Sequence, residues 1–331
     1  MAPMTLPHRT PLAFLPTPVH LLPRLSAHLK GPEIWIKRDD QTGLAFGGNK
    51  TRKLEFLIAE ALTFQCDCLI TAGAAQSNHC RQTAAAAAAV GLNCHLLLGG
   101  SPPASPSGNL LLDDILGSTI HWTGSQRKGE LIPKIKDELL AKGHKPYVVP
   151  YGGSNATGAK GFVHAMQELA RQESELGVSF DAIVFASSSG GTQAGLMVGK
   201  QILHSAVSLV GIRIDKEDGF GLPFPEHIIS LANLASDQLR LDHKFSSNDL
   251  VLHDEYMEAG YGVAGEQERE AIRLLARWEG ILVDPVYTAR AFGALLDLVR
   301  KKCFTRSQRV LFWHTGGAPA LFSYAEELAN L

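Results

Sequence analysis

The clearest indication of the fold is a strand-to-helix junction, Ala186-Ser-Ser-Ser-Gly-Gly-Thr-Gln-Ala-Gly195. Its small and hydroxylated residues join an apolar strand, 183–185, to a helix. Glycines let the backbone approach a ligand closely. Unpaired N–H groups at a helix start favour an anion such as a phosphate monoester. The stretch matches neither GxGxxG nor GxxxxGK[ST], so it does not indicate a dinucleotide or a P-loop nucleotide. A Gly/Ser turn that only caps the helix explains it equally well.

The same alternation of strand and helix runs along nearly the whole chain and predicts an α/β fold with mostly parallel sheets covered on both faces. Strands are expected at 33–37, 68–71, 94–98, 119–122, 147–149, 182–186, 208–213, 250–253 and 309–314. Helices are expected at 53–64, 77–90, 127–142, 160–175, 193–204, 266–279 and 288–301. The segments 101–107 and 219–225, rich in Pro, Ser or Gly, are expected to form surface loops.

The composition points to a globular protein with a small-molecule ligand. The chain has 331 residues, of which 45% are hydrophobic and 19% charged, with a formal net charge of −2. This length suggests two domains or one large α/β unit. So balanced a charge creates no overall field for nucleic acid or an anionic membrane. The longest apolar run, 83–92, is too short to span a membrane, which takes about 18 residues or more. Prolines interrupt any signal-peptide pattern near the N-terminus, so a cytoplasmic protein is expected.

The five cysteines predict no disulfide framework and no metal centre. They stand at Cys66, Cys68, Cys80, Cys94 and Cys303, an odd number without a CxxC pair. This pattern is typical of reduced, mostly buried thiols in a cytosol-like compartment.

Two further strand-to-helix junctions carry more polar chemistry than a turn requires. In the first, Lys50 follows Gly47-Gly48 and precedes the cations Arg52 and Lys53. A lysine that is desolvated near other cations has a depressed pKa and attacks carbonyl groups, although a solvated helix start is the plainer interpretation. In the second, Ser77 is the expected N-cap of a helix, and Gln76, Asn78 and His79 crowd the same turn.

The C-terminal part holds two comparable turns, at 282–288 and 314–319. Hydroxyl groups stand in both, at Tyr287, Thr288 and Thr315. For His314 a satisfied core histidine is the plainer interpretation, and Thr315 alone is explained as a helix cap.

In order along the chain, these motifs resemble the tryptophan-synthase-β-like (fold type II) pyridoxal-phosphate enzymes, within the family of 1-aminocyclopropane-1-carboxylate deaminase and D-cysteine desulfhydrase. The resemblance covers nearly the entire chain, and caps that arose independently would not fall in this order. The matching strings are Thr17-Pro-Val-His-Leu-Leu-Pro-Arg-Leu25, Trp35-Ile-Lys-Arg-Asp-Asp40, Gly47-Gly-Asn-Lys-Thr-Arg-Lys-Leu-Glu55, Gln76-Ser-Asn78, Gly191-Thr-Gln-Ala-Gly195, Asp284-Pro-Val-Tyr287 and His314-Thr-Gly-Gly-Ala-Pro-Ala-Leu-Phe322.

The resemblance implies two three-layer αβα domains and a bound pyridoxal 5'-phosphate. The large domain would comprise residues 1–50 and 155–331, with 51–154 inserted as a small domain. The family is expected to form homodimers, and no metal ion is implied. The resemblance assigns Lys50 as the Schiff-base lysine, Asn78 to the cofactor's phenolic oxygen and Thr315 to its ring nitrogen. The implied phosphate ligands are Ser188, Ser189, Gly190, Gly191 and Thr192 with Lys53; the implied substrate-binding or catalytic residues are Gln76, Ser77, Asn78, His79, Tyr261, Tyr287 and Thr288.

Two positions discriminate within the family. The deaminase is expected to carry Glu directly after Asp-Pro-Val-Tyr and an apolar residue before the last Gly-Gly, whereas this chain has Thr288 and Thr315. A neutral hydroxyl leaves the ring nitrogen largely unprotonated, a weaker electron sink that suits α,β-elimination of a thiolate. The resemblance therefore implies conversion of D-cysteine to pyruvate, hydrogen sulfide and ammonia.

Other activities remain open from the sequence. Within enzymes they are the deaminase reaction or a lyase reaction on L-cysteate, D-serine or β-chloro-D-alanine. A cofactor-binding or regulatory module that has lost catalysis is the alternative outside enzymes, and the joint presence of Lys50, Ser77, Asn78 and Tyr287 argues against it. Lys50, Ser77 and Tyr287 all qualify as the base that removes the α-proton.

Overall fold

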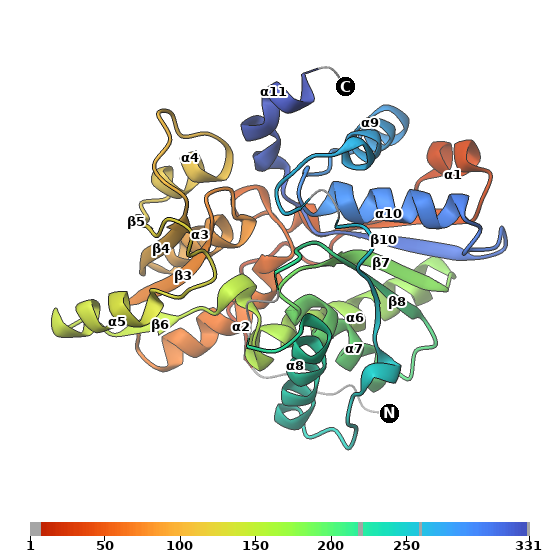
Figure 1. Ribbon diagram of the computed structural model, residues 1–331. Coiled ribbons are helices and arrows are strands. Elements are labelled where there is room, and N and C mark those ends of the chain that lie inside the picture. The colour runs from red at the N-terminus through yellow and green to blue at the C-terminus, as the bar shows by residue number, and fades with distance from the viewer. Residues whose placement is uncertain (1–7, 218–220, 258–259, 330–331) are drawn as a thin grey trace.

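The computed structural model describes residues 8–217, 221–257 and 260–329, and its strands form two separate sheets (Figure 1). The larger sheet has six strands in the order β1-β2-β10-β7-β8-β9. β1 runs antiparallel to β2, and all other pairs are parallel. The bounds are β1 Val19–Leu21, β2 Glu33–Arg38, β7 Ala182–Ser187, β8 Ser208–Arg213, β9 Val251–His253 and β10 Arg309–His314.

The smaller sheet is wholly parallel and has four strands in the order β5-β4-β3-β6. Its strands are β3 Cys68–Ala74, β4 Asn93–Gly99, β5 Thr119–Trp122 and β6 Pro146–Val148. All four come between β2 and β7 along the chain, so they interrupt the larger sheet. They fall inside the segment 51–154, whose exact limits as a domain stay a prediction.

Helices cover both faces of each sheet, which gives three-layer αβα packing. On the larger sheet, α1 Pro23–Leu29, α9 Glu266–Glu279 and α10 Thr288–Arg300 build one core, and α6 Ala156–Leu176, α7 Gly191–Ile202 and α8 Phe224–Gln238 build the other. On the smaller sheet, α2 Lys50–Thr63, α3 Asn78–Val90 and α4 Gly108–Ile115 lie opposite α5 Ile132–Ala141. Every residue of β7 is buried, as its unbroken apolar run predicts.

The predicted α/β class and every predicted strand are confirmed, but several helical elements differ. The helix expected at 127–142 begins only at Ile132, because Gly129 adopts φ 104° and Pro133 stands in the first helical turn. The loop expected at 219–225 is wrong at its end, where α8 already begins, and its residues 219–220 lie outside the described residues. The structure adds β1, α1, α4, α8, α11 Ala325–Leu328 and the 3₁₀ turns 39–41, 44–46, 151–153, 247–249 and 318–324.

The cysteines agree largely with the expectation of reduced, mostly buried thiols. All five cysteines are free; Cys68, Cys80 and Cys94 are buried, while Cys303 is exposed. Among the described residues, no helix combines the length and the apolarity that crossing a membrane requires.

Candidate functional site

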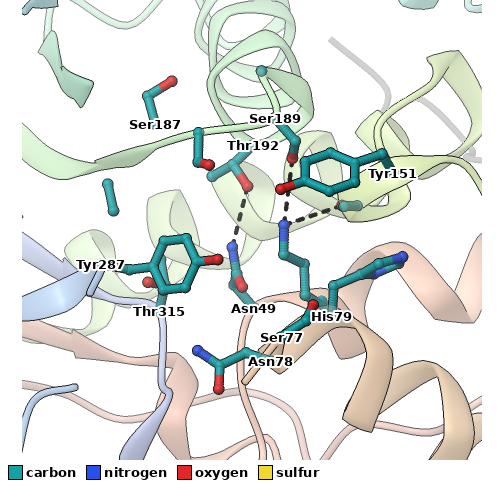
Figure 2. Close-up of a pocket in the computed structure, with 15 residues that line it drawn as sticks. Asn49, Ser77, Asn78, His79, Tyr151, Ser187, Ser189, Thr192, Tyr287 and Thr315 are labelled. Carbon is teal, nitrogen blue, oxygen red and sulfur yellow. Dashed lines mark hydrogen bonds between the residues drawn. The ribbon is translucent and has the colours of Figure 1, made fainter. Parts of the chain in front are cut away.

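A cavity lies between the two sheets, where the carboxyl ends of β7 and β10 face the starts of α2 and α3 (Figures 1 and 2). Ligands of open α/β sheets bind at such strand ends. The cavity and its opening to solvent hold about 600 Å³. It is lined by Asn49, Lys50, Ser77, Asn78, His79, Tyr151, Gly152, Ala186, Ser187, Ser188, Ser189, Gly190, Thr192, Tyr287 and Thr315.

Lys50 enters the cavity from the first turn of α2. The turn before it needs glycine, since Gly47 and Gly48 have φ of 65° and 130° and a side chain on Gly48 would collide with Gln82. The Lys50 Nζ lies 3.1 Å from the Gly152 carbonyl oxygen and 3.4 Å from the Ser189 Oγ. Burial lowers the pKa of Lys50 from 10.5 to about 8. Roughly a tenth of this amine is therefore neutral and nucleophilic at pH 7, far more than for an ordinary lysine.

The two neighbouring cations have different positions. The Arg52 guanidinium points away from the cavity, to Asp39 and Glu168 at 2.8 and 2.9 Å, and fastens α2 to the 3₁₀ turn after β2 and to α6. The expectation that Arg52 depresses the pKa of Lys50 is therefore wrong, because burial is the main cause. Lys53 lies behind the cavity wall, where its Nζ donates to the Gly152 carbonyl at 3.2 Å and to Ser154 Oγ at 3.1 Å. Burial holds its pKa well below 10.5.

The loop between β7 and α7 offers a cradle for an anion. Gly190 adopts φ 79° and is the N-cap residue of α7, and a helix N-terminus favours an anion. Gly190 and Thr192 line the cavity, whereas the Gly191 N–H donates to Ser154 Oγ at 3.2 Å. The buried Ser187 Oγ has no hydrogen-bond partner among the residues that the structure describes. Ser189 Oγ lies 2.7 Å from Ser154 Oγ, and Thr192 Oγ1 accepts from Asn49 Nδ2 at 3.2 Å. A buried, unsatisfied hydroxyl beside a helix N-terminus fits a phosphate ester, which supplies acceptor oxygens and negative charge.

At the start of α3, Ser77 is the N-cap residue as predicted, and its Oγ accepts from the Cys80 N–H at 3.2 Å. Asn78 Oδ1 accepts from Asn109 Nδ2 at 2.8 Å. This bond leaves the Asn78 Nδ2, a donor, on the cavity side. The first turn of α3 thus presents this donor and a positive helix end to an anionic group, beside the Ser77 hydroxyl.

His79 and Gln76 are held by the protein itself. Thr71 Oγ1 donates to the Val149 carbonyl at 2.9 Å, so it accepts from His79 Nε2 at 2.8 Å. Burial lowers the pKa of His79 well below 6.5, which keeps the ring neutral. The Gln76 side chain binds the Ser107 carbonyl and the Asn109 N–H. Gln76 therefore braces the loop before α4 and does not line the cavity.

The C-terminal turns place Tyr287 and Thr315 on the cavity wall. The Tyr287 hydroxyl meets that of Tyr261, which does not itself line the cavity. Thr288 also stays outside, because its hydroxyl donates to Asp284 Oδ1 at 2.6 Å. The Asp284 carboxylate also accepts from the Tyr287 and Thr288 N–H groups at the start of α10. His314 is a satisfied core histidine: Nε2 donates to the Leu282 carbonyl and Nδ1 accepts from Gly316 N–H.

Sequence reasoning missed the wall formed after β6. Tyr151 and Gly152 stand at the end of this strand, at a strand-to-helix junction like the others, so the same rule was able to find them. Asn49 and Ala186 line the cavity beside predicted residues and were also missed, whereas Ser187 is one of the three loop serines expected near an anion. The predicted Gly191 does not line the cavity. Glycine is needed there because a Cβ added to Gly191 would lie only 2.6 Å from the Ser154 Oγ.

Three possible metal ligands gather at the opposite, N-terminal edge of the smaller sheet. Asp67, Cys68 and His144 bring one ligand atom each within 4.8 Å of one another. Asp67 Oδ2 and His144 Nδ1 lie 3.0 Å apart, and Asp67 Oδ1 accepts from the Lys145 N–H. These bonds account for the arrangement without an ion.

Comparisons with known proteins agree with this geometry. The family model described as "Pyridoxal-phosphate dependent enzyme" matches residues 11–316. The D-cysteine desulfhydrase of Klebsiella pneumoniae (strain 342) is 44% identical over 326 residues, 97% of each chain. That of Salmonella choleraesuis is 44% identical over 322 residues, 96% of each chain.

A solved structure described as an ACC deaminase homologue is 38% identical, covers 97% of this chain and 95% of its own, and superposes with a TM-score of 0.89. Threonine deaminase isoform 2 from Solanum lycopersicum, 17% identical with a TM-score of 0.66, shares the fold. A buried lysine facing an anion cradle, on this fold and with these relatives, makes the chain a member of the pyridoxal-phosphate-dependent enzyme family.

Proposed function

We propose that this enzyme converts D-cysteine and water to pyruvate, hydrogen sulfide and ammonia. The observation that carries the proposal is the desolvated Lys50 amine, which faces the 187–192 loop across a cavity closed by Tyr287 and Thr315. The relatives of similar length named D-cysteine desulfhydrase support the substrate. Thr288 and Thr315, at the positions that separate the two activities of the family, support it independently.

The cavity residues suit pyridoxal phosphate. Lys50 would bond its aldehyde carbon, and the loop 188–192 would hold its phosphate, with Lys53 acting through Ser154. Asn78 Nδ2 would donate to the phenolic oxygen, and the Thr315 hydroxyl would meet the ring nitrogen. When bound, the cofactor withdraws electrons from the substrate's Cα. A hydroxyl partner keeps this withdrawal moderate, which is sufficient for a thiolate leaving group.

The protein's own groups orient the substrate and move its protons. Ser77 and the Asn78 N–H at the α3 start would bind the carboxylate, beside the neutral His79. Lys50, Ser77 and Tyr287 remain the candidate bases for the α-proton, since all three line the cavity. Loss of this proton and of hydrosulfide from Cβ leaves a C3 enamine, which water hydrolyses to pyruvate and ammonia. Tyr261 acts through the Tyr287 hydroxyl.

The test is release of pyruvate and sulfide, measured in parallel, from D-cysteine, L-cysteine, D-serine, β-chloro-D-alanine, L-cysteate and 1-aminocyclopropane-1-carboxylate. We expect D-cysteine to be the best substrate. Preferred turnover of the cyclopropane amino acid would make the enzyme a deaminase, and a bound cofactor without any turnover would make it a binding module. Lys50→Ala should lose both the visible absorbance of the bound cofactor and its trapping by borohydride. The matched control is Lys136→Ala, on the exposed side of α5.

We further propose a homodimer in a reducing, cytoplasmic compartment. The free thiols support the reducing compartment.

Two exposed phenylalanines support a dimer interface. Phe14 and Phe46 are 75% and 67% accessible, and the Phe14 ring lies against Gly43 near the Phe46 turn. Sedimentation velocity of the wild type and of Phe14→Ser tests the dimer; a wild type that sediments as a monomer would refute it.

A further inference from the structure

Arg127 connects the two sheets beside the cavity. It stands in the loop between β5 and α5, the part of the chain where a helix was expected. Its guanidinium donates to Asp215 Oδ2 at 2.7 Å and to Glu217 Oε2 at 3.0 Å, both beyond the end of β8. Only 16% of the Arg127 side chain and 7% of the Asp215 side chain are accessible. The ion pair is therefore shielded far better than a surface pair.

The same guanidinium contacts two tyrosines of the site. It lies over the Tyr261 ring, 4.4 Å from the ring centroid, and donates to the Tyr151 hydroxyl at 3.3 Å. Tyr151 lines the cavity, and Tyr261 meets the cavity residue Tyr287 through its hydroxyl. Arginine is suited to this position because its flat cation stacks on an aromatic ring and binds a carboxylate at once.

The local backbone is built to bring Arg127 to this place. Gly99, at the end of β4, leaves room for it, because a Cβ on Gly99 would lie 2.6 Å from the Arg127 Cβ. Lys128 strengthens the same crossing, since its Nζ donates to the Glu217 carbonyl at 2.8 Å and lies 3.6 Å from Asp215 Oδ2.

We propose that Arg127 is a positioning residue, which links the smaller sheet to the larger one through Asp215 and sets the Tyr261–Tyr287 pair against the substrate. Arg127 does not touch the α3 start, where the carboxylate would bind, so its loss affects the chemical step more than substrate binding. The inference deepens the proposed function and rests on it.

The test combines kinetics with hydrogen exchange of the holoenzyme. With D-cysteine, Arg127→Ala should lower kcat about tenfold, in keeping with a lost cation–π contact and ion pair, and change KM less than about threefold. Arg127→Lys keeps the charge but loses the ring stacking and the forked hydrogen bonding of the guanidinium, so its kcat should lie between those of the wild type and Arg127→Ala. Added guanidinium ion should partly restore kcat in Arg127→Ala. The control Arg309→Ala, which breaks an exposed ion pair with Glu33 at the far end of β10, should retain its kcat.

A second set of measurements separates this inference from the proposed function. Amide exchange in peptides covering 123–131 and 212–217 should accelerate in Arg127→Ala and in Asp215→Asn, whichever substrate the enzyme uses. A wild type inactive on D-cysteine would refute the proposed function but leave this exchange result in force. Unchanged exchange, or an unchanged kcat in both Arg127→Ala and Asp215→Asn, would overturn the positioning role. If Arg127→Ala does not fold, the kcat and the amide exchange of Arg127→Lys and Asp215→Asn test the positioning role instead.

Discussion

Asn109 Nδ2 donates a hydrogen bond of 2.8 Å to Asn78 Oδ1 and thereby decides which end of the Asn78 amide faces the cavity. The orientation of Asn109 is fixed in turn by Arg81, whose Nε donates to Asn109 Oδ1 at 2.7 Å. A guanidinium only donates, so both amides are oriented without ambiguity. The donor at Asn78 is therefore prepared before any cofactor binds.

Asn109→Ala should weaken cofactor binding by about three- to tenfold, because the Asn78 amide becomes free to rotate and loses a bond of about 1 kcal/mol. Titration of the apoenzyme with pyridoxal phosphate, followed by visible absorbance, measures the effect. Asn248→Ala, on an exposed turn, is the control. Equal affinities of both variants would show that Asn109 does not orient Asn78.

The rate at which Lys50 bonds the cofactor should depend on pH at lower pH values than is usual for a lysine. Burial lowers its pKa to about 8, and only the neutral amine attacks the aldehyde. The loading rate should rise as pH increases and level off above about 8. An ordinary lysine would be roughly 300-fold less neutral at pH 7, and its rate would keep rising toward pH 10.5. Stopped-flow absorbance of the apoenzyme distinguishes the two profiles.

Gly152→Ala should damage the site directly. Gly152 has φ 65°, and an added Cβ would collide with Ser189 Oγ and lie 3.1 Å from Lys50 Nζ. Gly177 has nearly the same φ, 66°, but open space around it. Both alanine variants should lose about 1–2 kcal/mol of stability from the left-handed backbone. Only Gly152→Ala should lose cofactor affinity, by tenfold or more; similar affinities would contradict the steric argument.

The two tyrosines should behave as a unit in which Tyr287 dominates. Tyr287→Phe removes a hydroxyl at the cavity wall and should lower kcat by about 10²-fold or more if that hydroxyl handles a proton. Tyr261→Phe should cost less, because Tyr261 acts through Tyr287. The double variant should resemble Tyr287→Phe alone. Additive losses would show that each hydroxyl acts on its own.

The strand-to-helix junctions were predictable because their signals are local. The apolar run before Ser187 and the glycines at 190–191 are neighbours in sequence, so the strand, the turn and the anion cradle follow from one stretch. Local signals also drew attention to Lys50 and Ser77, but there a solvated helix start and a simple N-cap were the plainer interpretations, and only the resemblance assigned the two residues a role. β1 is a three-residue strand whose only sheet partner is β2, too short to leave a periodic pattern.

What the sequence did not reveal depends on partners far along the chain. Arg52 looks like a neighbour of the reacting lysine, yet Glu168, more than one hundred positions away, draws its side chain to the opposite side. Thr288 is an exception, because its partner Asp284 is only four positions away: the Asp284 carboxylate binds the Thr288 hydroxyl and keeps it out of the cavity. Arg127 gave no signal, because only the fold brings Asp215 and Tyr261 to it.

The chain passes from the larger sheet to the smaller one immediately after Lys50 and returns through Tyr151–Gly153, whose Gly152 carbonyl lies 3.1 Å from Lys50 Nζ. Both crossings therefore meet at the Lys50 nitrogen, the proposed reacting group. A rotation of one sheet against the other would have its hinge at this point, so the lysine would hardly move while the walls around the substrate open and close. The inserted segment also begins and ends at one spot, so insertions in its outer loops can change the substrate opening without displacing the reacting amine.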